Sequence, residues 1–210
     1  MHNKNINKVV NSVLIILTLF LFSSCAKKYS PEQKKYIKGI EKFRQEKDED
    51  MKNDPSSPFN VDKNAHFKPL KYYDVNPDFV FKSRLFKYDN PDTVKIFGTK
   101  GEERKIIRFG YVKFNSNNNH YKLNVYKGAS GNGSTYYTIW FTDKTTGNET
   151  YGVGRYLDFD LNPDTSYVYT VDFNLAYNPY CAYSAKYSCA IPSKEDHLDL
   201  SIEAGEKNFH

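Results

Sequence analysis

From Phe59 onward, apolar and polar residues alternate with a period of two, a pattern that rules out a mainly helical fold for most of the chain. Leu123 and Val125 alternate with Lys122 and Asn124, and the same pattern recurs in residues 167–173 and 198–202. Alternation of this kind is typical of half-buried β-strands. Turn-forming runs separate these segments at short intervals, at residues 89–92, 98–101, 115–119, 128–133 and 162–164. The pattern predicts a mainly β fold, an antiparallel β-sandwich or small barrel.

Three segments add detail to this prediction. Gly110 lies where the apolar phase slips within residues 105–114, which indicates a β-bulge. Residues 135–141 are apolar on both faces and are expected to form a central strand. The glycine-rich run 128–133 lacks the Gly-Lys-Ser/Thr ending of a phosphate-binding loop. We therefore expect this run to be a hairpin connection.

One helix is predicted before the β region. Ser30, Pro31 and Gln33 place an N-cap, a proline at the first helical position and a capping-box glutamine in the right order. Two prolines, Pro55 and Pro58, end the helical pattern. A narrow apolar stripe follows the capping box, made of Tyr36, Ile37, Ile40, Phe43 and Met51. A stripe this thin leaves two possibilities open, a helix docked on the β domain and a solvated spacer.

The first 25 residues have the pattern of an export signal. Lys4 and Lys8 precede an uncharged apolar segment at residues 13–22, which is about half the length of a membrane-spanning helix. Ser23 and Ser24 then lead into Cys25, a run that resembles the lipobox of bacterial lipoproteins, in which the cysteine is acylated. We predict a signal peptide at 1–24, a lipidated tether and helix at 25–54, and a β domain at 55–210. The alternative is an ordinary secretory signal.

Lipidation of Cys25 would anchor the mature protein in the cell envelope. In related lipoproteins, acidic residues after the cysteine can direct export to the surface, whereas here Ala26, Lys27 and Lys28 follow it. This favours a position facing the periplasm. The sequence does not distinguish the inner from the outer membrane, and it does not define an oligomeric state.

The net charge gives no indication of a nucleic-acid partner. The chain has 30 Lys and Arg against 25 Asp and Glu, a net charge of +5. Residues 55–210 hold 19 and 18 of these, so most of the excess positive charge belongs to the signal and tether. A nearly neutral domain is not expected to bind nucleic acid.

Polar residues and aromatic residues are mixed between Asp143 and Cys189 more densely than strand packing requires. The Arg155 guanidinium could bind a carboxylate or phosphate through two parallel hydrogen bonds. It could equally pair with Asp143, Asp158 or Asp172 inside the fold. The candidate ligand-binding residues, for a small polar or anionic ligand, are Asp143, Tyr151, Arg155, Asp172, Asn174 and Asn178.

These segments resemble a bacterial family named domain of unknown function sixteen-eighty-four, often found as lipoproteins. The matching motifs are D-x-T-x-G at 143–147, T-Y-x-x-G-R-Y-L-D at 150–158, D-F-N-x-A-Y-N-P-x-C-A-Y at 172–183 and A-G-E-K at 204–207. The likeness extends back to Arg44, Lys47, Asp48 and Met51 in the helix and to residues 57–59. It departs from the family pattern after Cys189. The resemblance implies a mainly β domain and no established activity.

Two cysteines remain if Cys25 is lipidated. Cys181 and Cys189 lie eight residues apart, and in an oxidising compartment we expect them to form a disulfide. The alternatives are a catalytic thiol and a metal site shared with His66 or His197. Because the chain has no Cys-x-x-Cys motif and no closely spaced histidine pair, we predict no metal and no cofactor.

The favoured function is that of a periplasm-facing lipoprotein that binds a small ligand in a pocket closed by the Cys181–Cys189 loop. One alternative is a hydrolase that uses Asp172 as the base and Arg155 as the electrostatic stabiliser. Another is a structural or protein-interaction role in the envelope. The sequence assigns no catalytic residue and does not decide whether the protein is an enzyme.

Overall fold

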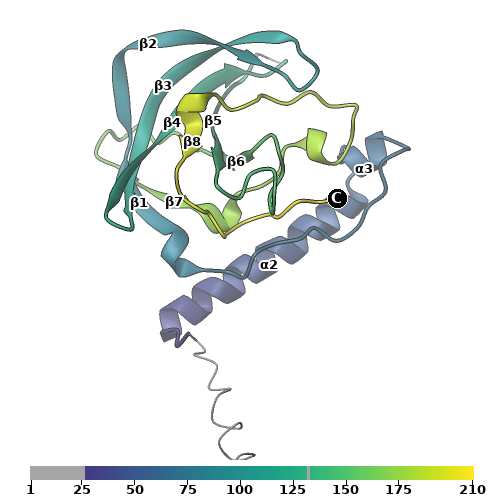
Figure 1. Cartoon of the computed structure of the whole chain (residues 1–210), viewed down its shortest axis with the longest axis horizontal. Coiled ribbons are helices and arrows are strands. Elements are labelled where there is room, and N and C mark those ends of the chain that lie inside the picture. Colours follow the sequence, from purple (N-terminus) through teal and green to yellow (C-terminus); the bar gives the residue numbers. More distant parts are fainter. Residues whose placement is uncertain (1–26, 132) are drawn as a thin grey trace, which may run out of the picture. The chain divides into compact units, whose positions relative to one another are not determined.

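A computed structural model describes residues 27–131 and 133–210, in two units that divide after Lys34. The predicted signal peptide and Cys25 lie outside the described residues. Helix α2 (Pro31–Asn53) precedes the β region, and residues 35–210 form one compact unit (Figure 1). No helix among the described residues is both long enough and apolar enough to cross a membrane.

The strands of the described residues form two sheets. They are β1 (Val80–Arg84), β2 (Phe86–Phe97), β3 (Glu103–Ser116), β4 (Asn119–Ala129), β5 (Thr135–Asp143), β6 (Arg155–Asp158), β7 (Val168–Asp172) and β8 (His197–Leu198). Strands β2 to β6 pair antiparallel in chain order, β8 pairs in parallel with β5, and β1 pairs antiparallel with β7 (Figure 1). The prediction of a mainly antiparallel β fold with one long N-terminal helix is confirmed. Across the described residues the strands do not close into a barrel.

The core lies where the strands present their apolar side chains. Phe173 is fully buried, and its ring centroid lies 5.2 Å from that of Phe141 and 5.3 Å from that of Phe114. Leu123 and Val125, the alternating residues of β4, are also fully buried. The alternation in the sequence thus marks the side chains that the fold removes from water.

The expected bulge and hairpin are present. The β3–β4 register shifts between Arg108 and Gly110, and a Cβ atom at Gly110 would lie 2.6 Å from the Phe86 carbonyl oxygen. The glycine-rich run begins in the last residues of β4 and leads to β5, which pairs antiparallel with β4 and is flanked by β4 and β6.

The strand expected at residues 198–202 stops after Leu198. Leu198, Leu200 and Ile202 are buried as the alternation predicts. Beyond Leu198, however, the backbone forms hydrogen bonds with a loop and with a side chain, and not with a neighbouring strand. The Leu200 carbonyl accepts from the Lys144 N–H at 3.1 Å, and the Ile202 N–H donates to Asp143 Oδ2 at 2.7 Å.

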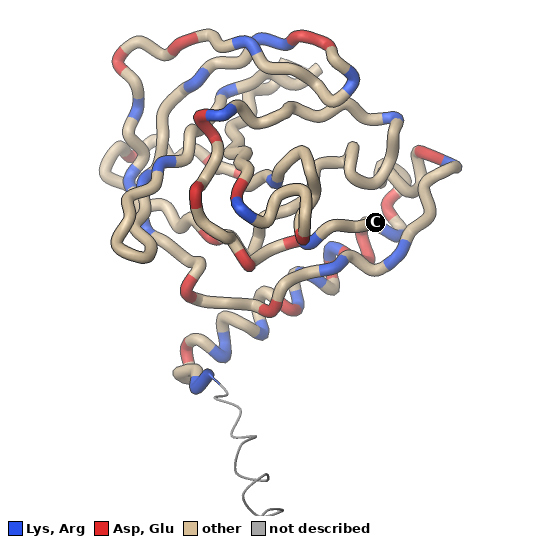
Figure 2. The backbone as a smooth tube through the Cα atoms, in the orientation of Figure 1, with Lys and Arg blue, Asp and Glu red and all other residues tan. Residues whose placement is uncertain are grey.

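Helix α2 is docked on the β domain through residues 35–53. Its capping box forms as expected, with Gln33 N–H donating to Ser30 Oγ at 3.2 Å. Ile40 and Met51 are buried, and the buried Arg44 guanidinium donates to the Tyr73 carbonyl at 2.8 Å. Charged residues of both signs lie along the length of the helix (Figure 2). The solvated-spacer alternative is therefore wrong for residues 35–53.

Short helical turns complete the fold. They are α3 (Pro58–Val61), η2 (Pro77–Phe79), η3 (Phe173–Leu175), η4 (Tyr180–Ala182) and η5 (Lys194–Asp196). Asp172 caps η3, because its side chain accepts from the Asn174 N–H at 2.9 Å. The segment after η3 runs beside β6 on the side away from β5, where Tyr177 forms an isolated antiparallel bridge with Tyr156 through two backbone hydrogen bonds.

Candidate ligand-binding groove

Arg155 lies inside the fold and not at an open site. Its side chain is 1% exposed, and its Nη2 donates to Asp143 Oδ2 at 3.2 Å and to the Ile202 carbonyl at 2.8 Å. Its Nη1 donates to the carbonyls of Ala204 and Glu206. Burial lowers the pKa of the guanidinium, and the Asp143 carboxylate opposes that shift. Of the two possibilities left open by the sequence, Arg155 takes the internal pairing with Asp143.

Asp143 is equally committed to internal bonds. Besides Arg155, its carboxylate accepts from the Thr145 hydroxyl at 2.8 Å and from the Ile202 N–H at 2.7 Å. Its side chain has no exposed surface. Asp143 and Arg155 therefore join β5 and β6 to the C-terminal segment.

Asp172 and Asn174 form a second polar cluster, next to α2. The Tyr36 hydroxyl donates to Asp172 Oδ2 at 2.7 Å, and the Asn174 amide donates to Asp172 Oδ1 at 3.0 Å. The Asn174 Oδ1 accepts from the Asn76 N–H at 2.8 Å. The described contacts do not connect Asp172 with Arg155, the two residues that the hydrolase alternative requires to act together.

Tyr151 lies beside the two cysteines. Its hydroxyl donates to the Cys181 carbonyl at 3.2 Å, and the Cys181 N–H donates to Cys189 Sγ at 3.2 Å. Both cysteines are free thiols of intermediate exposure. Among the described residues no group of three or more His, Cys, Asp or Glu side chains could hold a metal ion.

Asn178 lines an open cavity, and one of its side-chain atoms has no hydrogen-bond partner. Its Nδ2 donates to the Lys207 carbonyl at 2.8 Å, and its N–H donates to Glu206 Oε2 at 2.8 Å. Its Oδ1 is buried and has no hydrogen-bond partner. A buried acceptor of this kind is costly unless a bound group satisfies it.

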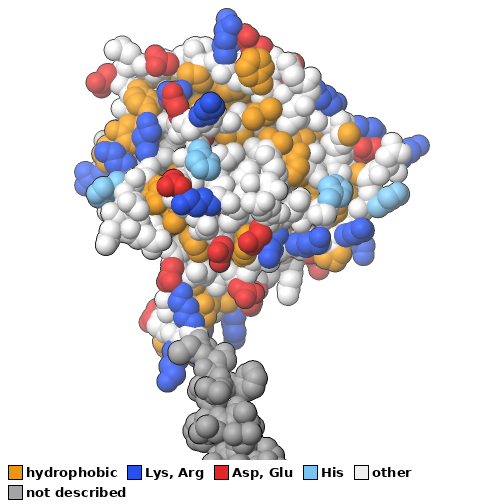
Figure 3. Space-filling model, viewed as in Figure 1, with side chains coloured by type: hydrophobic (Ala, Val, Ile, Leu, Met, Phe, Trp, Pro, Cys, Tyr) orange, Lys and Arg blue, Asp and Glu red, His pale blue; other side chains and the backbone are white. Residues whose placement is uncertain are grey.

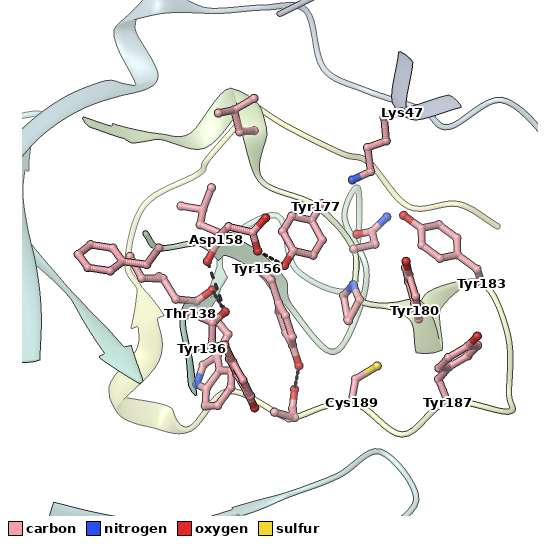
Figure 4. A pocket seen from close by; sticks show the side chains of 18 of the residues that line it. Lys47, Tyr136, Thr138, Tyr156, Asp158, Tyr177, Tyr180, Tyr183, Tyr187 and Cys189 are labelled. Atoms are coloured by element: carbon pink, nitrogen blue, oxygen red, sulfur yellow. Dashed lines mark hydrogen bonds between the residues drawn. The ribbon is translucent and has the colours of Figure 1, made fainter. Parts of the chain in front are cut away.

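The cavity is a groove of about 910 Å³ between the C-terminal half of α2, the outer face of β5 and β6, and the segment 175–190 (Figure 4). We call it the tyrosine groove. Its aromatic lining consists of Phe43, Tyr136, Tyr137, Trp140, Tyr156, Phe159, Tyr177, Tyr180, Tyr183 and Tyr187. Its charged lining consists of Lys47, Asp50, Asp54, Arg104, Asp158 and Asp172.

The sheet register explains why tyrosines gather on this face. Thr138 pairs with Asp158 and Trp140 pairs with Tyr156, so these four side chains and Tyr136 point to the same side of β5 and β6. The ring centroids of Trp140 and Tyr156 lie 5.8 Å apart, and those of Tyr156 and Tyr177 lie 6.1 Å apart. The result is a continuous aromatic wall.

The two cations of the groove are already paired with carboxylates. Lys47 Nζ lies 2.7 Å from Glu206 Oε1, and Arg104 forms an ion pair with Glu102. Asp158 is exposed and accepts a hydrogen bond from the Tyr177 hydroxyl at 2.7 Å (Figure 4). Burial, followed by the Asp158 carboxylate, raises the pKa of Tyr177, which therefore remains a donor.

No pattern in the sequence selects Tyr136, Asp158 and Lys47 as one set. Tyr136 lies on β5 and Asp158 lies on the neighbouring strand β6. The alternation of side chains along each strand could have indicated that both point to the same face of the sheet. Lys47 comes from a helix whose docking position the sequence did not define. Of the predicted residues, Asp172 and Asn178 line the groove, whereas Asp143, Tyr151, Arg155 and Asn174 do not.

The protein is thus a mainly β domain with one docked helix and an open groove. No activity is assigned to this class of protein. The chain belongs to the family of proteins of unknown function DUF1684, whose sequence profile matches residues 65–207. It is similar to an uncharacterised protein of Haloarcula marismortui, solved by solution NMR, with 27% identity and a TM-score of 0.60 over 84% of this chain and 96% of that chain. None of the curated proteins matches. The resemblance drawn from the motifs is confirmed.

Proposed function

We propose that this protein is a lipid-anchored binding protein of the cell envelope that holds a small polar ligand in the tyrosine groove. The observation that carries the proposal is the groove itself, a concave cavity of about 910 Å³ that combines an aromatic wall with charged and polar side chains. Cavities of this size and lining are typical of small-molecule sites.

The exposed rings of the groove support binding over a purely structural role. Tyr136 and Tyr180 are each 43% exposed although they are large aromatic residues at a concave surface. No hydrogen bond among the described residues uses the hydroxyl group of Tyr136, Tyr180 or Tyr187. A ligand in the groove would cover these rings. On the face seen in Figure 3, by contrast, apolar side chains are scattered among charges of both signs.

A thermal-shift screen against metabolites, with Tyr180→Ala as the test variant, examines the proposal. A compound that binds the folded protein at one hundred times its Kd adds about 2.7 kcal/mol of stability, so the melting temperature rises by several degrees. We expect Tyr180→Ala to reduce this rise. Tyr167→Ala is the control, because Tyr167 is 44% exposed and does not line the groove. A screen without shifts, or equal loss in both variants, would contradict a ligand site in the groove.

The proposed envelope location rests on Cys25, and a proposed disulfide between the other two cysteines is supported by their closeness, since the Cys181 N–H lies 3.2 Å from Cys189 Sγ. Cys189 lines the groove. A hydrogen bond from the Cys189 thiol lowers the pKa of Cys181 below its ordinary value, against the effect of burial. The thiolate is the attacking form in disulfide exchange. Exchange with an oxidised dithiol partner would transfer two electrons to that partner and close the loop 181–189 beside the groove.

Mass spectrometry of the protein extracted from membranes tests both modifications. We expect an N-terminal peptide that begins at acylated Cys25, and non-reduced peptides in which Cys181 is joined to Cys189. The Cys25→Ala variant should lose the acylated peptide and keep the disulfide. An unmodified Cys25 would refute the anchor, and two free thiols in freshly extracted protein would refute the disulfide.

A further inference from the structure

We infer that the tyrosine groove selects organic cations, compounds that carry a substituted ammonium group on a small apolar body. This inference rests on the proposed function, because it names the class of ligand that the groove would bind. It also reverses the sign of charge expected from the sequence, which placed Arg155 at the site and favoured a polar or anionic ligand.

The charge of the groove is the first argument. Its lining holds four carboxylates, those of Asp50, Asp54, Asp158 and Asp172, and two cationic side chains. Both cations are paired with glutamates that are not part of the lining, Lys47 with Glu206 and Arg104 with Glu102. An anionic ligand would therefore meet uncompensated carboxylates and no free cation of the lining.

The position of Asp158 is the second argument. None of the ion pairs among the described residues involves this carboxylate, and the Tyr177 hydroxyl is its hydrogen-bond donor. Tyr136 and Tyr156 project from the same face of the sheet. Figure 4 shows Asp158 beside Tyr177, with Tyr156 and Tyr136 nearby. An ammonium group here would face a free negative charge and several aromatic rings.

The aromatic wall is the third argument. A ring attracts a cation to its face through its quadrupole, and this attraction grows when the pair is shielded from water. The groove already contains one such contact, since Lys47 Nζ lies 4.7 Å from the Tyr177 ring centroid. A neutral sugar could also stack on tyrosines, but its binding would not depend on the charge of Asp158.

Isothermal titration with three matched probes separates these ligand classes. Choline carries the ammonium group, 3,3-dimethylbutan-1-ol replaces its nitrogen with carbon, and 3,3-dimethylbutanoate carries the opposite charge. We expect choline to bind at least about tenfold more tightly than the neutral alcohol, and the carboxylate not to bind. Raising the salt concentration should weaken choline binding more than alcohol binding.

Two pairs of variants test whether the charge of Asp158 and the ring of Tyr136 cause the preference for choline. Asp158→Asn keeps an acceptor for the Tyr177 hydroxyl and removes the charge, so choline affinity should fall about tenfold while alcohol affinity is unchanged. Asp160→Asn removes the same charge from an exposed residue outside the groove and should change neither affinity. Tyr136→Phe should preserve choline binding, whereas Tyr136→Leu should weaken it.

Each outcome is decisive. Equal binding of choline and the alcohol, no choline binding, or equal effects of the two asparagine variants would overturn cation selectivity. If a neutral or anionic compound from the metabolite screen still requires Tyr180, the groove remains a binding site and only its ligand class changes. If no compound of any charge requires Tyr180, the proposed function fails as well.

Discussion

Replacement of Arg155 by methionine is expected to lower the free energy of unfolding by about 3 to 5 kcal/mol, the cost of breaking a buried ion pair by removing one partner. Methionine fills a similar volume but donates no hydrogen bond. The Asp143 carboxylate would lose its cation, and the carbonyls of Ile202, Ala204 and Glu206 would lose their donor. Urea denaturation monitored by circular dichroism measures the effect.

The matched control is Arg84→Met on β1. Arg84 is exposed, so its loss should change the free energy of unfolding by no more than about 0.5 kcal/mol. If Arg155→Met were as mild as the control, Arg155 would not hold the C-terminal segment, and a role at a ligand site would again need consideration.

Gly205→Ala is expected to destabilise the protein by about 2 to 5 kcal/mol, the sum of left-handed backbone strain and overpacking. Gly205 has a φ of +76°, and a Cβ atom there would lie 2.6 Å from the Ala176 carbonyl oxygen and 2.7 Å from the Phe173 carbonyl oxygen. Both obstacles are backbone atoms of a buried turn, so no side chain can move aside.

Gly101→Ala separates the two causes. Gly101 has a similar φ of +85°, but a Cβ atom there meets nothing within 4 Å. Only the backbone strain should remain, about 1 to 2 kcal/mol. Thermal and urea denaturation of both variants would test the difference. Equal destabilisation would show that the contacts around Gly205 do not limit the residue at this position.

The fold was predictable wherever one strand or helix carries its own pattern. Leu123 and Val125 alternate because one face of β4 is buried, and the bulge at Gly110 follows from a slip in that alternation. Residues 199–202 show the limit. Burial produced the same alternation there, although the backbone hydrogen bonds go to a loop and to Asp143.

The candidate site was less predictable, because its parts come from segments far apart in the chain. Lys47 and Asp158 meet at one groove only after α2 docks on the β domain. Arg155 shows the opposite case, because it was predicted at the ligand site and lies inside the fold. Its place between glycines and acids fits a ligand site as well as an internal one, and the three carbonyls that bind it lie about fifty residues further along the chain.

Helix α2 would have a mechanical consequence in the lipid-anchored form that we propose. The helix that begins at Pro31 also supplies Lys47, Asp50 and Met51 to the groove wall. Tension on the part of the helix that begins at Lys35 would reach these three residues along the helix. A ligand bound in the groove would contact both the helix and the β domain, so it would resist separation of residues 35–53 from that domain.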